Sequence, residues 1–211
     1  MNRLIYFFAA FALTIALFFV PFRILVFNQG FYSLEQKKLN VFEQVGENKT
    51  RNLTIEVINY LSKGSASLSE FTQREKDHLY DVRVLIEWAL AIGSLSVLIC
   101  IVLLYLSRKE NISSVFVVSG AVSLSIIIIF SLLSLISFDF FFTVFHQIFF
   151  KPGTWTFNPE YEVIKQLFPN RFFFDFIVYN ALAIAFLSVI SMIFGMIYKK
   201  AFKQRKSLKR K

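Results

Sequence analysis

Four long apolar stretches decide what this chain of 211 residues can fold into. They lie at about residues 4–26, 84–106, 113–137 and 174–197. Each can cross the hydrocarbon core of a membrane, roughly 30 Å thick, because an α-helix needs about 20 residues to do so. A helix also satisfies its own backbone hydrogen bonds, which an irregular segment exposed to lipid cannot do. The pattern therefore predicts an all-α membrane protein with four transmembrane helices.

The composition and the N-terminal stretch agree with this class. Hydrophobic residues make up 56% of the chain, against about 45–50% in soluble domains. The first apolar stretch is longer than the apolar region of about 7–15 residues in a signal peptide, and no small-residue cleavage site follows it. We therefore expect a retained helix that ends near Pro21.

The distribution of basic residues predicts the orientation. Residues 199–211 contain eight lysines and arginines and no acid, and the short connection at 107–112 is also basic. Cytoplasmic segments are enriched in lysine and arginine. We expect 107–112, 198–211 and both termini to be cytoplasmic, with 27–83 and 138–173 on the extracytoplasmic side. The net charge of +9 comes mostly from this tail. Topology and attraction to anionic lipid account for it, so no nucleic-acid partner is predicted.

Residues 27–83 have the pattern of a helical cap. Apolar residues recur at helical spacing within 53–61, and Gly64 is typical of a helix end. Thr72 and Glu75 match a capping box, in which each residue bonds the other's backbone N–H. The sequence therefore predicts a helix that begins near Thr72 and continues unbroken into the second span.

Residues 138–173 are nearly as aromatic as the spans, but prolines interrupt them at 152, 159 and 169. Aromatic rings are favoured at membrane interfaces, so we expect an aromatic interfacial segment there. Asn158, Pro159 and Glu160 resemble a helix start, which predicts a short helix over about 159–168. The helix of the third span is expected to continue to about residue 150.

The only two histidines lie at the extracytoplasmic ends of the second and third predicted spans. His78 is followed at helical spacing by Asp81, and His146 is preceded at helical spacing by Asp139 and Thr143. A carboxylate beside an imidazole holds it in one tautomer and stabilises its protonated form. The spacing leaves two interpretations open: an acid–base site, or polar residues with a structural role.

Further ionisable residues lie near the predicted membrane boundaries. Glu87 and Asp175 fall slightly inside the second and fourth spans, and Asp139 follows the third. Ionisable groups at membrane depth are functional candidates. The alternative is that these acids pair with arginines to hold the helices together. The candidate partners are Arg23, Arg83 and Arg171.

No other motif for chemistry is present. The sequence lacks Gly-x-Ser-x-Gly, a phosphate loop and Cys/His metal spacing, so no metal or organic cofactor is predicted. Two alternatives to an acid–base enzyme remain. One is an electron carrier that binds b-type haem through both histidines. The other is a non-catalytic membrane assembly or binding protein.

Several motifs together resemble the lipoprotein intramolecular transacylase (Lit) family. They are Glu75-x-x-His78-x-x-Asp81-Val82, Phe145-His146-x-x-Phe149-Phe150, Trp155, Pro159 and LFPxxFFxD at 167–175. The resemblance covers essentially the whole chain. Lys151, Asn158 and Asn170 depart from the polar or acidic residues usual in the family at these positions, but the two recurring histidines fall on His78 and His146.

The resemblance implies a multi-pass enzyme of the bacterial cell membrane. Such an enzyme moves the sn-2 acyl chain of a diacylglyceryl-modified lipoprotein onto the α-amine of its N-terminal cysteine, which gives the lyso-form. Its partners are these lipoproteins and membrane lipid. His78, oriented by Asp81, or His146 is expected to act as base and the other histidine as acid, without a cofactor. The residues expected to contact substrate are Trp155, Arg171, Phe142, Phe149, Phe150, Glu87, Asp139 and Asp175.

Overall fold

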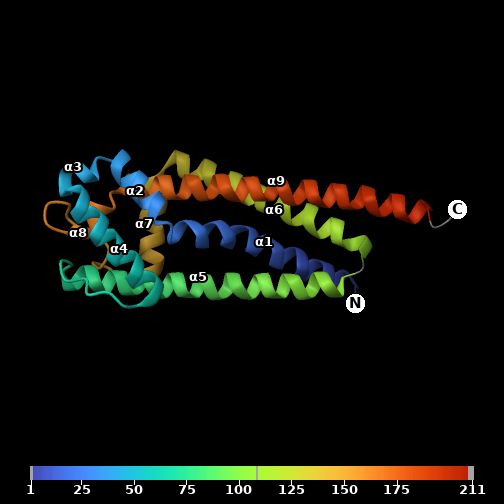
Figure 1. Ribbon diagram of the computed structural model, residues 1–211, viewed down its shortest axis with the longest axis horizontal. Coiled ribbons are helices and arrows are strands. Elements are labelled where there is room, and N and C mark those ends of the chain that lie inside the picture. The colour runs from blue at the N-terminus through green and yellow to red at the C-terminus, as the bar shows by residue number, and fades with distance from the viewer. Residues whose placement is uncertain (1, 108, 209–211) are drawn as a thin grey trace. The chain divides into compact units, whose positions relative to one another are not determined.

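The predicted all-α class is confirmed. A computed structural model describes residues 2–107 and 109–208, and the elements in these ranges are all helices (Figure 1). They are α1 (Asn2–Val26), α2 (Gln29–Lys38), α3 (Val41–Val45), α4 (Glu47–Lys63), α5 (Gln73–Leu106), α6 (Lys109–Ile136), α7 (Phe138–Phe149), α8 (Val163–Leu167) and α9 (Asn170–Leu208).

Helices α1, α5, α6 and α9 each contain a stretch that is long and apolar enough to cross a membrane. The protein is therefore a multi-pass membrane protein of the predicted class. The expected end of the first helix near Pro21 is wrong, because α1 runs to Val26 with Pro21 inside it. A proline removes one backbone donor, and membrane helices tolerate this loss when neighbouring groups satisfy the carbonyl it leaves.

The described chain forms two compact units. The first contains the residues up to Arg23, then Leu90–Leu132, and the chain from Asn180 onwards. The second contains Ile24–Ala89 and Leu133–Tyr179.

Serine hydroxyls and glycines hold the first unit together. The hydroxyl of Ser119 donates to the carbonyl of Ala10 at 2.9 Å, and that of Ser113 donates to the carbonyl of Gly195 at 2.7 Å. A Cβ atom on Gly195 would lie 2.7 Å from the Ser113 carbonyl oxygen, so only glycine permits this approach. Small residues and interhelical hydrogen bonds replace the hydrophobic effect as the packing force within lipid.

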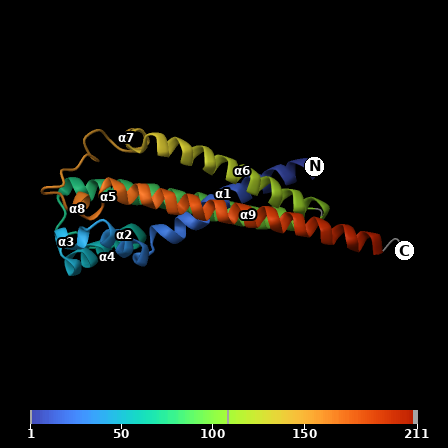
Figure 2. The same cartoon turned by 90° about the horizontal axis from the view of Figure 1, so that it is seen from above.

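In the second unit, α2, α3 and α4 lie together with α8, as both views show (Figures 1 and 2). The buried Gln36 amide donates to the Thr54 hydroxyl at 2.8 Å and to the Leu167 carbonyl at 3.3 Å, which ties α2 to α4 and α8. The apolar face predicted for 53–61 is buried. Gly64 ends α4 with a φ of 73°, as its position predicted.

Helix α5 begins with the predicted capping box. The backbone N–H of Thr72 donates to Glu75 Oε2 at 2.7 Å, and the N–H of Glu75 donates to the Thr72 hydroxyl at 3.3 Å. The helix then runs for 34 residues without a break. His78 is therefore held on a regular helix, one turn after its capped start.

Two expectations about the aromatic segment are wrong. The third span does not continue to residue 150, because Ser137 leaves helical geometry between α6 and α7, with φ −158° and ψ 81°. The later helix begins at Val163 rather than 159. Asn158 Oδ1 accepts from the N–H of Glu160 at 2.9 Å and so forms a local turn, while Glu162 takes the cap position.

Candidate active site

The fold brings the two histidines together. His78 comes from the first turns of α5 and His146 from α7, and their ring centroids lie 6.1 Å apart with an angle of 20° between the planes. Their exposed fractions are 7% and 8%. The two imidazoles are thus buried side by side and take no part in the caps and turns that stabilise the helices. We take this pair as the candidate site.

A backbone hydrogen bond fixes the tautomer of His146. Its Nδ1 atom lies 2.7 Å from the carbonyl oxygen of Phe142. A carbonyl only accepts hydrogen bonds, so Nδ1 carries the proton and Nε2 keeps its lone pair. Burial lowers the pKa of His146, the Phe142 carbonyl opposes this change, and the Lys165 cation lowers the pKa further. His146 is therefore a neutral imidazole with a basic Nε2 near pH 7.

Ring packing holds His78. Phe150 lies 4.8 Å and Phe157 5.3 Å from its ring, measured between centroids. Its buried Nδ1 has no hydrogen-bond partner among the described residues. Asp81, half-buried one turn further along α5, therefore makes no bond to that atom in the described structure. The orienting role of Asp81 stays a prediction.

Aromatic rings surround the imidazole pair. Phe142 lies 4.1 Å and Trp155 4.9 Å from the His146 ring, and Phe150 contacts both histidines. These three are the predicted substrate-contacting residues that the fold places against the pair. Phe149 contacts Phe145 instead, at 4.9 Å, and is half exposed.

The ring geometry does not fit the haem alternative. A haem held by both histidines would need open space between the two imidazoles. Phe150 is almost equidistant from the two rings, at 4.8 Å from His78 and 5.1 Å from His146. The Phe150 ring therefore packs against both imidazoles and leaves no such open space beside them.

Two of the predicted acids, Glu87 and Asp175, pair with arginines, which was the structural alternative to a functional role. Glu87 accepts from Arg83 at 2.8 Å. Asp175 accepts from Arg171 at 3.1 Å and from Lys38 at 2.9 Å. Substrate contact by Glu87, Asp175 or Arg171 stays a prediction.

Asp139 is instead close enough to Lys165 to oppose the lowering of the lysine pKa that burial causes. The Lys165 ammonium thus interacts with the Asp139 carboxylate and in turn lowers the pKa of His146. Substrate contact by Asp139 also stays a prediction.

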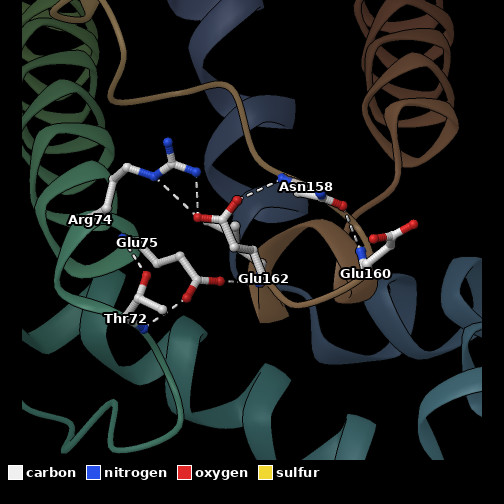
Figure 3. A network of polar contacts seen from close by, with 7 residues as sticks. Thr72, Arg74, Glu75, Asn158, Glu160 and Glu162 are labelled. Atoms are coloured by element: carbon white, nitrogen blue, oxygen red, sulfur yellow. Dashed lines mark hydrogen bonds and ion pairs between the residues drawn. The ribbon is translucent and has the colours of Figure 1, made fainter.

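Sequence reasoning did not predict how three charged residues act around the pair. Glu75 was expected as a cap and as part of the family motif, but its second carboxylate oxygen also accepts from the backbone N–H of Ile164 at 2.7 Å. Glu162 binds Arg74, 88 residues earlier in the chain (Figure 3). The Lys165 ammonium lowers the pKa of His146. Only Glu75 carried a local signal, because the partners of the other two are distant in sequence.

The fold and the site define a multi-pass, all-α membrane protein with a buried imidazole pair. A family model described as "Lipoprotein intramolecular transacylase Lit" matches residues 7–173. The chain belongs to this family, whose members are acyltransferases. Family membership removes the interpretation as a non-catalytic assembly protein.

Solved structures show the same fold. The membrane-integral lipoprotein intramolecular transacylase Lit from Bacillus cereus matches with a TM-score of 0.86 at 21% identity, over 97% of this chain and 98% of that chain. A variant of that protein with one histidine replaced by arginine matches with a TM-score of 0.84 at 21% identity, over 98% and 95% of the two chains. No match was found among curated protein sequences.

The site predicts a graded response to substitution of Asp81. Asp81→Asn removes a charge near His78 but no group that exchanges a proton. General acid–base catalysis contributes about 10²–10⁴-fold, so we expect a loss of acyl transfer smaller than about 10²-fold. Initial rates with a diacylated lipopeptide measure it. An Asp81→Asn enzyme as fast as the unchanged protein would show that Asp81 has no orienting role.

Proposed function

We propose that this protein transfers the sn-2 acyl chain of a diacylglyceryl-cysteine lipoprotein to the α-amine of the same cysteine, by histidine acid–base catalysis. The observation that carries the proposal is the buried imidazole pair in a chain of the lipoprotein transacylase family. The products are an amide on the cysteine and a free hydroxyl on the glycerol. Acyl groups are neither gained nor lost.

The chemistry needs one proton to move from nitrogen to oxygen. The amine nitrogen attacks the sn-2 ester carbonyl, and a tetrahedral adduct forms. A base then takes a proton from this nitrogen, and the bond from carbon to the glycerol oxygen breaks as that oxygen receives a proton. The proton removed at nitrogen balances the one needed at oxygen, so the imidazole pair ends each turnover with its initial charge.

We assign the base to His146. The Phe142 carbonyl holds its Nδ1 proton and leaves Nε2 as the acceptor. Burial lowers the pKa of His146, which keeps the ring neutral. A weak base suffices because the nitrogen becomes much more acidic once it has attacked the carbonyl carbon.

We assign the acid to His78. It relays to the departing glycerol oxygen the proton that His146 has taken from nitrogen, because a neutral imidazole can accept a proton at one ring nitrogen while it gives up the proton on the other. The stacked rings lie 6.1 Å apart between centroids, so one can reach the attacking nitrogen and the other the departing glycerol oxygen without a large movement. No hydrogen bond of the described residues occupies His78 Nδ1, so packing alone directs the ring.

The nucleophile and the ester belong to one molecule, so the enzyme mainly has to fold its substrate. Well-oriented intramolecular reactions reach effective molarities of about 10⁵–10⁸ M. The aromatic residues of α7 and the following segment suit alkyl chains, because they bury apolar surface and exclude water. A separate acyl-enzyme would add a step, so we propose direct attack by the amine, with Thr143 unacylated.

The oxyanion of the adduct needs a hydrogen-bond donor. Trp155 is the candidate that lies against His146, and its indole N–H is a donor without acceptor capacity. Arg171, another of the residues expected to contact substrate, is also a donor, but it pairs with Asp175 and stacks over Phe174 at 4.6 Å. We therefore favour Trp155 for this role.

We also propose that both termini are cytoplasmic and that the histidines face the extracytoplasmic side. The basic tail and the basic connection at 107–112 support this orientation. The substrate amine would then meet the imidazoles at the outer interface, while the acyl chains stay in lipid.

The histidine assignment is tested by His78→Ala and His146→Ala. Each variant should lose at least about 10²-fold in transfer rate, because each lacks one partner of the proton transfer. Conversion of a diacylated lipopeptide to the N-acyl product, followed by mass spectrometry, measures the rate. Tyr80→Ala, at an exposed position of α5, is the control. Near-normal rates in both histidine variants would refute the two-histidine mechanism.

The orientation has its own test. Tags inserted at about residues 65 and 155 should react with a membrane-impermeant reagent added to intact cells, and tags at 110 and 211 should react only after lysis. Labelling of a tag at 110 from outside would contradict the proposed topology and the placement of the histidines.

A further inference from the structure

We propose that Glu162 and Glu75 are positioning residues for the histidine pair, because they fix the segment between α7 and α8 against the start of α5. This segment, residues 150–162, contains three of the rings that contact the imidazoles: Phe150, Trp155 and Phe157. The inference rests on the proposed function, since it assigns these carboxylates to the geometry of that same site.

Glu162 joins two parts of the unit that are distant in sequence. Its Oε1 accepts from Arg74 Nε at 3.1 Å and from Arg74 Nη2 at 2.5 Å, and its Oε2 accepts from the backbone N–H of Asn158 at 2.6 Å (Figure 3). The residue is only 3% exposed. Both carboxylate oxygens are thus used, one toward α5 and one toward the segment itself.

Glu75 makes a second connection beside the first. It is fully buried. One oxygen accepts from the N–H of Thr72, which begins α5, and the other accepts from the N–H of Ile164 in the first turn of α8. A single carboxylate therefore caps both helices and sets the position of α8 relative to α5.

The histidine lies one turn beyond these contacts. Arg74 and Glu75 precede His78 by four and three residues on α5, so they share its side of the helix. The Arg74 guanidinium lies 5.2 Å from the centroid of the Phe157 ring, and the His78 ring lies 5.3 Å from the same centroid. Phe157 thus transmits the position of the Arg74–Glu162 pair directly to one imidazole.

The other imidazole depends on the same segment. The Trp155 ring lies 4.9 Å from His146. The segment is fixed at its start by the hydrogen bond from the N–H of Phe150 to the carbonyl of His146, at 2.9 Å, and at its far end by Glu162. Release of the far end would free Trp155 and Phe157 together and admit water to both histidines.

A buried carboxylate is an expensive way to hold two helices together, because apolar side chains of similar volume often stabilise as well or better. What a carboxylate adds is direction, since each oxygen accepts along a defined line. Two imidazoles that exchange protons with one folded substrate need closely fixed positions, because a misplacement of about 1 Å can lower the rate about 10²-fold.

The test uses Glu162→Gln, Arg74→Ala and the double variant in the full-length protein. We expect each single variant to lower kcat by about 10–100-fold with a smaller change in KM, and the double variant to be no worse than the poorer single one, because both act through one contact. Glu47→Gln, which breaks the exposed pair with Arg51, is the matched control and should leave kcat unchanged.

The pH profile separates positioning from simple loss of stability. The substrate amine must also be unprotonated, and its ordinary pKa is about 7.7–8.0, so the acid limb of the enzyme is the one left in kcat/KM after the titration of the amine is divided out. In the unchanged enzyme this limb should lie below the ordinary histidine value of about 6.5, because the lowered pKa keeps His146 neutral at lower pH. Lys165 from α8 is the charged group that lowers the pKa of His146, and His78 from α5 is the titratable group stacked against it. Both are retained in Glu162→Gln, so water entry should move the limb upward, toward 6.5.

The outcomes distinguish this inference from the proposed function. If Glu162→Gln and Arg74→Ala lower the melting temperature but leave kcat and the acid limb unchanged, the carboxylate is structural and the inference is wrong. Arg74→Lys, which keeps the charge but loses the paired contact, serves if the other variants do not fold, and it should show the same upward shift. Fully active histidine variants would instead refute the proposed function.

Discussion

An imidazole buried among aromatic rings is useful as a proton carrier only if something other than water fixes its orientation. Several contacts of the second unit meet this requirement. The Phe142 carbonyl holds the proton of His146 on Nδ1, and three rings confine the His78 imidazole, including that of His146 itself. Those rings are held in turn by Glu75 and Glu162, which tie α8 and the segment before it to the start of α5.

The same apolar setting suits the proposed substrate. Rings that exclude water also accept alkyl chains, so one group of residues can bind acyl chains and lower the pKa of His146. A neutral imidazole is the form needed to accept a proton from the attacking nitrogen. In the proposed mechanism, binding and proton transfer thus depend on one physical condition, the exclusion of water from the site.

Local patterns predicted what depends on near neighbours in the chain. The capping box of Thr72 and Glu75, the end of α4 at Gly64 and the four apolar helices are all present. Contacts between distant residues were not predictable. The Arg74–Glu162 pair spans 88 residues, and nothing near Ser137 indicates that the helix breaks there. Both histidines were proposed as site residues from the sequence, as were Phe142, Phe150 and Trp155, but the contacts of these rings with the imidazoles are visible only in the fold.

A crossover experiment tests the central claim most directly. The purified protein is given two diacylglyceryl lipopeptides together, with different peptides and with only one carrying an isotope-labelled sn-2 chain, and the products are sequenced by mass spectrometry. Direct intramolecular transfer predicts that the label moves to the α-amine of its own peptide alone, with no change in the acyl count. Label on the amine of the other peptide, or products in which the amine stays free, would contradict the account.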